Sequence, residues 1–296
     1  MEKRIDNCGN WVFNELKLCA GIKRVLYIDK PSTSIKLEKK MKINLKNKDQ
    51  VAQMRIAGQL AAEVLEMITP FVIPGVSTEE LDQRCYDFIV NEQNAIPANV
   101  GYSGYKKTIC SSVNQVICHG IPSEKKILKD GDILNIDVTV IRDGWHGDTS
   151  KMFMIGKTQP HNERLVKVTQ ECLYKAIEVV KPGAHLGDIG AAIQEHAQKN
   201  HYSVVEDYCG HGIGQVYHED PQILHYGKAG RGLEIQEGMC FTIEPMINQG
   251  SKYTKILSDG WTVETKDGRN SAQWEHTLAV TASGVEVLTK RNEELF

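Results

Sequence analysis

Two octapeptides, Asp130-Gly-Asp-Ile-Leu-Asn-Ile-Asp137 and Glu237-Gly-Met-Cys-Phe-Thr-Ile-Glu244, decide the fold of this 296-residue chain. They lie 107 residues apart, and each has an apolar run that ends on a carboxylate. A second similar pair, Val72-Ile-Pro-Gly75 and Val180-Lys-Pro-Gly183, lies 108 residues apart. Segments that resemble each other at one spacing indicate an internal repeat. The sequence therefore predicts two related halves that face each other about a pseudo-twofold axis.

Each predicted half also contains two helices. Asn47 and Gln50 have the spacing of a capping box, and apolar residues then recur at intervals of three and four positions up to Ile68. Further helices are expected over about 77–94, 162–180 and 186–199. Strand-like runs with Asp-Gly turns at 143–144, 259–260 and 267–268 lie between and after the helices. This order of elements predicts the α/β (α+β) fold class.

The composition is that of an ordinary globular protein. Hydrophobic residues make up 41% and charged residues 25% of the chain, which excludes a wholly disordered protein. There is no apolar run of about 18 residues to span a membrane, and the start of the chain does not lead into the apolar segment of a signal peptide. The eight cysteines contain no Cys-x-x-Cys pair, which argues against a zinc ribbon or a disulfide scaffold. We therefore expect a cytoplasmic protein with reduced thiols and no membrane partner.

Charge divides the chain into a basic N-terminal extension, residues 1–46, and a main domain, residues 47–296. Residues 1–48 hold 12 Lys and Arg against 5 Asp and Glu, an excess of +7, so the remainder of the chain carries −10. One interpretation of the extension is a solvated arm. The other is an arm that contacts an anionic partner such as RNA.

Two aspartates, Asp137 and Asp148, lie on facing strands of a predicted β-hairpin. Asp137 lies inside the apolar run 133–140, where an acid is disfavoured. A two-residue turn at Asp143-Gly144 would pair residue 137 with residue 150 and put Asp148 diagonally across from Asp137 on the same face. Such positions are roughly 7–8 Å apart. The two carboxylates could then converge on one ion. The alternative for Asp148, if it is considered without Asp137, is an exposed structural residue near a turn.

Two more acids and a histidine extend this set. Glu244 ends an apolar run, Glu275 stands at the mouth of another, and His211 lies between glycines that let a backbone approach closely. Four carboxylates buried together require a cation or raised pKa values, and their repeat-related positions favour the cation. Hard oxygen ligands with one imidazole suit Mn, Fe(II) or Co, and also Zn, rather than a closed structural zinc site.

From about residue 47 to its end, the chain resembles the type I methionine aminopeptidases. The resemblance covers about five sixths of the chain and leaves the N-terminal extension outside. The matching motifs, in order along the chain, are Ser111-Ser-Val-Asn-Gln-Val-Ile-Cys-His-Gly-Ile-Pro122, Gly144-Trp-His-Gly-Asp-Thr-Ser150, Gly210-His-Gly-Ile-Gly214, Glu219-Asp-Pro-Gln-Ile-Leu-His-Tyr226, Phe241-Thr-Ile-Glu-Pro245 and Asp259-Gly-Trp-Thr-Val263.

The resemblance implies a pita-bread fold over residues 47–296, with two pseudo-twofold-related halves around a dinuclear metal site. It implies that Asp148 and Glu275 bridge two divalent ions, that Asp137 holds one ion, and that His211 and Glu244 hold the other. The ions are expected to be Co, Mn, Fe(II) or Zn. A monovalent cation is expected near Asn114, Val116 and Ser271.

The resemblance also implies the catalytic and substrate-binding residues. Glu244 is expected to shuttle a proton, and His119 and His218 to bind the developing oxyanion and the scissile amide. A pocket for the methionine side chain is expected to have aromatic walls that suit a thioether. Residue 217 is often Phe in this family, and Asn99 stands where many bacterial members have Cys, so both bear on the shape of the pocket. Its lining maps to Tyr102, Tyr105, Cys110, Tyr217 and Trp261, with His119 at its edge.

The implied function is removal of the initiator methionine from nascent proteins whose second residue is small, by a monomeric enzyme. The expected partners are N-terminal Met peptides and nascent chains, with a ribosome contact through the basic extension. One alternative is an X-Pro aminopeptidase or prolidase of the same fold, and another is a non-catalytic relative that binds ribosomes or RNA. The stretch Cys118-His-Gly-Ile-Pro122 and the retention of all five ligand positions favour the first function.

Overall fold

The computed structural model describes residues 4–5, 11–12 and 42–294. Contacts divide the chain into two units, Met1–Glu38 and Lys39–Phe296. The first unit contains two short antiparallel strands, β1 (Arg4–Ile5) and β2 (Trp11–Val12). Most of the basic extension predicted for residues 1–46 lies outside the described residues, so the choice between a solvated arm and an RNA contact stays a prediction.

The first half of the second unit is a helix pair on an antiparallel sheet. Strand β6 (Ile133–Arg142) is central: β7 (Trp145–Met154) pairs with it along its whole length, and β4 (Ile109–Val113) and β3 (Ile96–Pro97) pair with its other edge. The helices are α1 (Lys48–Ile68), followed by the 3₁₀ turn Thr69–Phe71, and α2 (Thr78–Asp87), followed by the π-helical turn Phe88–Glu92; a further 3₁₀ turn covers Tyr102–Gly104.

The second half repeats this plan. Helices α3 (Pro160–Glu178) and α4 (Leu186–Lys199) pack together and cover strands of this half. The main sheet has five strands, in the order β10 (Glu219–Ile223), β9 (Gly210–Gly212), β11 (Cys240–Ile243), β16 (His276–Thr281) and β17 (Gly284–Val287). Strands β6 and β11 begin at Ile133 and Cys240, the spacing of the sequence repeat, and this confirms the two predicted halves.

Two three-stranded sheets complete the second unit, and both join residues that are distant in sequence. One has the order β15 (Ser271–Gln273), β12 (Met246–Asn248) and β8 (Ser203–Val204). The other has the order β13 (Thr254–Ile256), β14 (Val263–Thr265) and β5 (Val116–Cys118), so it pairs a strand of the first half with strands of the second.

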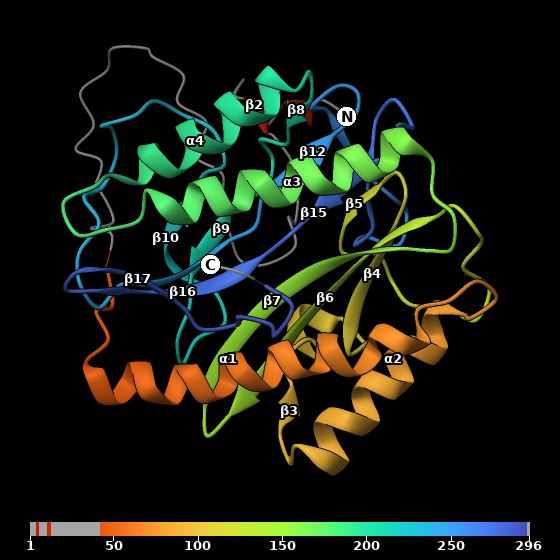
Figure 1. Ribbon diagram of the computed structural model, residues 1–296, viewed down its shortest axis with the longest axis horizontal. Coiled ribbons are helices and arrows are strands. Elements are labelled where there is room, and N and C mark those ends of the chain that lie inside the picture. Colours follow the sequence, from red (N-terminus) through yellow and green to blue (C-terminus); the bar gives the residue numbers. More distant parts are fainter. Residues whose placement is uncertain (1–3, 6–10, 13–41, 295–296) are drawn as a thin grey trace. The chain divides into compact units, whose positions relative to one another are not determined.

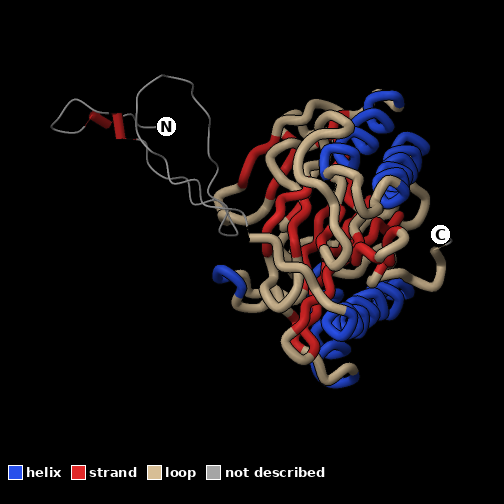
Figure 2. Tube along the Cα trace, turned by 90° about the vertical axis from the view of Figure 1, so that its left-hand side faces the viewer, coloured by secondary structure: helices blue, strands red, loops and turns tan. Residues whose placement is uncertain are grey.

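Helices lie on the outside of the second unit and strands lie between them (Figures 1 and 2). Buried side chains of α1 and α2 pack on β4 and β6 in one core, and side chains of α3 and α4 pack with β11, β12 and β16 in another. In the part of the chain that the structure describes, no helix has the length and apolarity that a membrane crossing needs.

Local sequence signals account for the ends of several elements. The Asn47 side chain accepts a hydrogen bond from the Gln50 backbone and the Gln50 side chain accepts one from the Asn47 backbone, so the predicted capping box is confirmed. The β6–β7 turn has Asp143 at φ 51° and Gly144 at φ 81°. Two central residues with positive φ form the turn type that matches the twist of a hairpin.

Gly147 in β7 lets helix α1 approach the sheet closely. A Cβ atom at this position would lie 2.4 Å from the backbone C and O of Ala57 and from the N of Gly58. Backbone atoms cannot rotate away as a side chain can, so a larger residue would push the helix from the strand that also carries Asp148.

We expect Gly147→Ala to lower the free energy of unfolding by about 1–3 kcal/mol, the usual range for an overpacked core. Denaturant unfolding of both proteins measures this change. Gly284→Ala in β17 is the matched control, because a Cβ there meets nothing within 4 Å, and its effect should stay within about 0.5 kcal/mol. Equal stability of the Gly147→Ala protein and the unaltered protein would contradict the close approach.

Candidate metal centre and active site

The β6–β7 hairpin brings the first two acids together. Asp137 pairs with Ser150 and Thr139 pairs with Asp148, which confirms the predicted register. Asp148 is buried, with 3% of its surface exposed. The exposed structural role that Asp148 alone suggested is therefore wrong, because the hairpin continues into the centre of the second unit.

The second half supplies the other acids at the end of one strand pair. Ile243 of β11 pairs with His276 of β16, so Glu244 follows one strand and Glu275 precedes the other. Glu275 also forms a bridge with Ser150 of β7. This bridge joins the sheets of the two halves at the acids themselves.

A buried cluster of ligand atoms results. Asp148, His211 and Glu275 each offer one ligand atom within 4.8 Å of the others. The Nε2 atom of His211 lies 3.6 Å from Oδ2 of Asp148 and 3.7 Å from Oε1 of Glu244. Asp137 is close enough for the charges of Asp148 and Glu244 to perturb its pKa. The structure thus brings three of the five expected ligands within reach of one ion, places Glu244 beside His211, and places Asp137 within range of their charges.

The acids of this cluster resist ionisation. Burial, and then the charge of Asp148, raise the pKa values of Asp137 and Glu275 well above their ordinary values. Burial raises the pKa of Glu244 to about 7, although His211 acts in the opposite direction. Carboxyl groups packed this way become anionic at neutral pH only when a cation compensates them. The residues present therefore fit one or more divalent ions with oxygen and nitrogen ligands.

The imidazole of His211 is oriented as a metal ligand. Its Nδ1 atom lies 3.0 Å from the carbonyl oxygen of Gly212, so Nδ1 carries the hydrogen and the Nε2 lone pair faces Asp148 and Glu244. Burial lowers the pKa of His211, but the contact with Asp148 and the charge of Glu244 outweigh burial and raise it. The Nε2 atom therefore lies where a positive charge is stabilised.

His218 lies beside this cluster as a neutral hydrogen-bond donor. Burial, with the neighbouring His211 and His119, lowers the pKa of His218 to about 2. The hydroxyl of Tyr102 lies 2.7 Å from Nδ1 of His218, and burial raises the pKa of Tyr102. The tyrosine therefore keeps its proton and can donate it to Nδ1, and in that tautomer Nε2–H of His218 is the free donor.

His119 has the features of a residue held for a ligand. Its φ of 57° is unusual for a residue with a side chain. Its Nδ1 atom is buried and has no hydrogen-bond partner among the residues that the structure describes. Burial lowers the pKa of His119 to about 4, so the ring is neutral and presents an unused polar atom.

The expected pocket residues form two adjoining aromatic groups. The ring of Tyr105 meets Trp261 edge-on at 4.9 Å between centroids, and His119 lies 6.3 Å from Trp261. Tyr217 stacks on His218 at 4.3 Å and lies 4.8 Å from Tyr102. Cys110 pairs with Asp137 in the sheet and contacts Tyr105. The group of Tyr105 and Trp261 is therefore connected to Asp137 through Cys110 and lies beside His119, and the group of Tyr217 and Tyr102 contacts His218.

A comparison with protein families gives one match that spans most of the chain. The model of "Metallopeptidase family M24" matches residues 52–282. The chain belongs to metallopeptidase family M24. Enzymes of an M24 metallopeptidase family use divalent metal ions, and the acid cluster described above fits that requirement.

Relatives within family M24 are similar to the chain over most of its length. The methionine aminopeptidase of Escherichia coli (strain K12) is 57% identical over 254 residues, which is 86% of this chain and 96% of that protein. The crystal structure of methionine aminopeptidase from Rickettsia prowazekii has a TM-score of 0.83 at 53% identity, and it covers 84% of this chain and 100% of that one. These comparisons confirm the predicted family resemblance and the pita-bread fold.

Prolidases share the M24 fold at a greater distance. The prolidase from Pyrococcus furiosus has a TM-score of 0.66 at 20% identity, and the match covers 84% of this chain and 66% of that one. A likeness at this identity concerns the fold alone.

The sequence analysis did not predict several residues that hydrogen-bond to the acids and hold the cluster in place. The Thr149 hydroxyl donates to the carbonyl of Glu275 and accepts from Arg291, which is fully buried. Thr277 donates to the carbonyl of Asp148, and the backbone of Glu244 donates to His225. Residues 290–294 are mostly charged, a pattern typical of a solvent-exposed segment. No feature of the sequence therefore indicated that Arg291 is buried.

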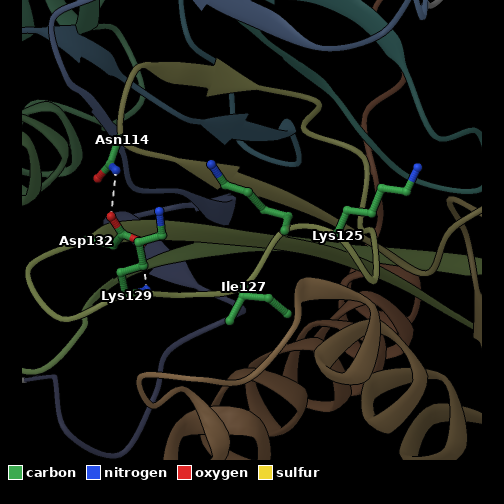
Figure 3. A pocket seen from close by; sticks show the side chains of 6 residues that line it. Asn114, Lys125, Ile127, Lys129 and Asp132 are labelled. Carbon is green, nitrogen blue, oxygen red and sulfur yellow. Dashed lines mark hydrogen bonds between the residues drawn. The ribbon is translucent and has the colours of Figure 1, made fainter.

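The predicted monovalent cation site is near a separate cavity of about 320 Å³ (Figure 3). The backbone carbonyl of Asn114 accepts from the Ser271 backbone, and the Asn114 side chain donates to Asp132. Val116 and Ser271 do not line the cavity, so it is distinct from the predicted cation site, which stays a prediction. The cavity is lined by Asn114, Lys125, Lys126, Ile127, Lys129 and Asp132.

Proposed function

We infer that this chain is a metal-dependent methionine aminopeptidase that removes the initiator methionine of nascent proteins when the second residue is small. The observation that carries this inference is the buried cluster of carboxylates and one imidazole beside two groups of aromatic side chains. The identity to relatives named methionine aminopeptidase supports it. Two divalent ions, held by Asp137, Asp148, His211, Glu244 and Glu275, are part of the proposal.

The metal ions supply Lewis acidity, because bound divalent ions lower the pKa of water and polarise a carbonyl oxygen. The residues of the chain do the rest. Glu244 lies 3.7 Å from Nε2 of His211 inside the cluster, and a carboxylate at this position can accept and return a proton. Its carboxylate is held by Thr242 and Gln273, whose side chains lie 3.0 Å and 3.3 Å from its two oxygens. We propose that Glu244 moves the proton from the attacking water to the leaving amine.

His218 and His119 are proposed to bind the reacting peptide bond. In this proposal Tyr102 donates to Nδ1 of His218, so that Nε2–H is ready to donate to an oxygen on which negative charge develops. A neutral imidazole that does not change its protonation near neutral pH acts as a constant donor. The unpartnered buried Nδ1 of His119 can bind the scissile amide.

The two aromatic groups are proposed to form the walls of the methionine pocket. Aromatic rings favour the polarisable sulfur of a thioether at their edges. Trp261 contacts both Tyr105 and His119, so it lies at the junction between the wall of the pocket and a residue of the reaction.

We expect Trp261→Ala to weaken discrimination between methionine and leucine at the substrate N-terminus. One methylene or a similar difference in an apolar pocket is worth about 1–3 kcal/mol, so the ratio of kcat/KM values for Met-Ala-Ser over Leu-Ala-Ser should fall about 10-fold or more. Competition of the two peptides in one reaction measures this ratio. An unchanged ratio would mean that the side chain binds elsewhere.

The experiment that tests the function is hydrolysis of Met-Ala-Ser and Ala-Pro-Gly by metal-free protein titrated with Co²⁺, Mn²⁺, Fe²⁺ or Zn²⁺. Cleavage of Met-Ala-Ser that requires metal supports the proposal. Preferential cleavage of Ala-Pro-Gly would instead indicate an X-Pro peptidase. No metal-dependent cleavage of either peptide would indicate a non-catalytic relative.

We further propose that the protein is a cytoplasmic monomer that meets its substrates at the ribosome. Five cysteines of the described residues are free thiols, which suits a reducing compartment: Cys85, Cys110, Cys172, Cys209 and Cys240. The +7 excess in residues 1–48 motivates the contact with ribosomal RNA.

Deleting residues 1–38, the first unit, should leave peptide hydrolysis nearly unchanged and weaken co-sedimentation with ribosomes. Contacts to phosphates release counterions, so co-sedimentation of the full chain should fall steeply between about 50 and 200 mM salt. Co-sedimentation assays across this range measure the effect. Equal co-sedimentation of both proteins at low salt would contradict docking through the extension.

A further inference from the structure

A chain of buried and partly buried hydrogen bonds connects the aromatic residues to one of the acids. The hydroxyl of Thr139 donates to Oδ1 of Asp148 at 2.7 Å. The same hydroxyl contacts the hydroxyl of Tyr217. The Tyr217 hydroxyl donates to Oδ1 of Asn99 at 2.7 Å. Thr139 is fully buried, and Asn99 and Asp148 are buried with 6% and 3% of their surfaces exposed.

The direction of each hydrogen bond follows from the partners. Nδ2 of Asn99 donates to the carbonyl of Thr108 at 3.1 Å, so Oδ1 of Asn99 is an acceptor. An ionised Asp148 also only accepts. The single hydrogen of Thr139 therefore goes to Asp148. The single hydrogen of Tyr217 goes to Asn99, and the contact between the two hydroxyls lets Thr139 share it as a second acceptor. The Tyr217 hydroxyl is thus the only donor in this chain of contacts that can support Thr139 while Thr139 donates to Asp148.

The ring of Tyr217 carries contacts on the side of the pocket. It stacks on His218, lies 4.8 Å from Tyr102, and approaches His211 at 6.1 Å between centroids. One side chain therefore touches a proposed pocket wall, a proposed catalytic histidine and, through Thr139, a proposed metal ligand. The Tyr217 side chain is therefore held both by packing on the faces of its ring and by hydrogen bonds at its hydroxyl.

We propose that Tyr217 and Thr139 are positioning residues that fix the carboxylate of Asp148 for metal binding, so that the wall of the pocket and the metal centre form one connected unit. This proposal rests on the proposed function, since it takes Asp148 as a metal ligand. Partners that orient a ligating group typically change metal affinity by about 10- to 100-fold when they are removed. The alternative is that the Tyr217 hydroxyl only satisfies Asn99 and fills space.

Three substitutions separate these roles, with the metal alone as the probe. Tyr217→Phe removes one oxygen and keeps the ring, Thr139→Val replaces the hydroxyl with a methyl group, and Thr139→Ser keeps the hydroxyl. Thr169→Val is the matched control, because Thr169 is also fully buried but its hydroxyl bonds within its own helix, to the carbonyl of Leu165. Co²⁺ binding to metal-free full-length protein is measured by calorimetry and by the visible absorption bands of the bound ion.

We expect Tyr217→Phe and Thr139→Val to weaken Co²⁺ binding by about 10- to 100-fold and to change the absorption bands. Thr139→Ser and Thr169→Val should bind Co²⁺ as the unaltered protein does. The double variant Tyr217→Phe with Thr139→Val should lose little more than Thr139→Val alone, because both act through one hydrogen bond.

Unchanged Co²⁺ affinity and absorption in both Tyr217→Phe and Thr139→Val would overturn the proposal, even if their melting temperatures fall. Equal losses in Thr169→Val would overturn it as well, because the effect would then be general destabilisation. Failure of the unaltered protein to bind Co²⁺ would instead contradict the proposed function, so the two failures are distinguishable.

Discussion

Glu275→Gln is expected to lower kcat/KM for Met-Ala-Ser by at least about a thousandfold, because it replaces an anionic ligand with a neutral amide. Metal ions contribute several kcal/mol to the stabilisation of a transition state, and about 4 kcal/mol corresponds to about a thousandfold in rate. Steady-state kinetics at saturating Co²⁺ measures the loss. Glu275 is buried, with 2% of its surface exposed, so the same loss should not arise from a changed surface.

The metal-free Glu275→Gln protein should melt at a higher temperature than the metal-free unaltered protein. Burial and neighbouring acids raise the pKa of Glu275 above its ordinary value, so the folded state holds this proton more tightly than the unfolded state does. Between the pKa that Glu275 has in the unfolded chain and its higher pKa in the folded protein, only the unfolded chain releases the proton. The free energy of unfolding therefore falls as the pH rises through this range. The amide removes that cost, and the gain should be present at pH 7 and absent below about pH 4.

Addition of metal should reverse the order of the two melting temperatures. A ligand that binds only the folded state raises stability by an amount set by its concentration over its Kd, and only the unaltered protein retains the full ligand set. Calorimetric melting with and without Co²⁺ tests both orders. Near-normal turnover together with normal metal stabilisation in the Glu275→Gln protein would contradict the assignment of Glu275 as a ligand.

His218→Ala is expected to lower kcat by about 100- to 1,000-fold, the range found when one donor to a developing oxyanion is removed. KM should change little, because the hydrogen bond acts mainly in the transition state. Tyr102→Phe should give a smaller decrease, since it removes the hydroxyl that fixes the tautomer of His218 but keeps the imidazole.

The pH dependence of kcat is the control for the His218→Ala prediction, because it tells a constant hydrogen-bond donor from a titrating acid or base. The pKa of His218 is lowered to about 2, so the imidazole is neutral throughout the working range and its loss should not remove a limb of the pH profile between about pH 5 and 9. Kinetics of the three proteins across that range provide the test. An effect confined to KM would place His218 in substrate binding, and loss of one limb of the profile would make it a titrating acid or base.

Much of the fold follows from local sequence patterns. The turn at Asp143-Gly144 determines the register of β6 and β7, because a two-residue turn leaves one pairing of the strands. That register alone puts Asp137 and Asp148 on one face. The spacing of 107 residues between Ile133 and Cys240 determines that the second half repeats this arrangement with Glu244.

The cluster was predictable from the sequence because acids are rare inside apolar strands. An ionisable group in such a run needs a compensating charge wherever the strand is buried. The residues proposed to line the methionine pocket could be named only through family resemblance, since aromatic residues are common in any core. The positions of the helices followed from periodicity, but two bounds differ. The helix expected over 162–180 begins at Pro160, because proline is accepted in the first turn. The helix expected over 77–94 is α-helical only to Asp87, and a π-helical turn follows over Phe88–Glu92.

The sequence by itself therefore determined the hairpin register, the repeat and the identity of the acids, all of which depend on neighbours along the chain. Only the tertiary structure decided which atoms face one another: Nε2 of His211 toward two carboxylates, Tyr217 onto Thr139, and Arg291 against Thr149. Arg291 is 142 residues from Thr149, and its charged tail gave no local sign of burial. These contacts depend on how two sheets and the end of the chain pack together. Contacts between residues so far apart in sequence leave no periodic pattern from which they could be predicted.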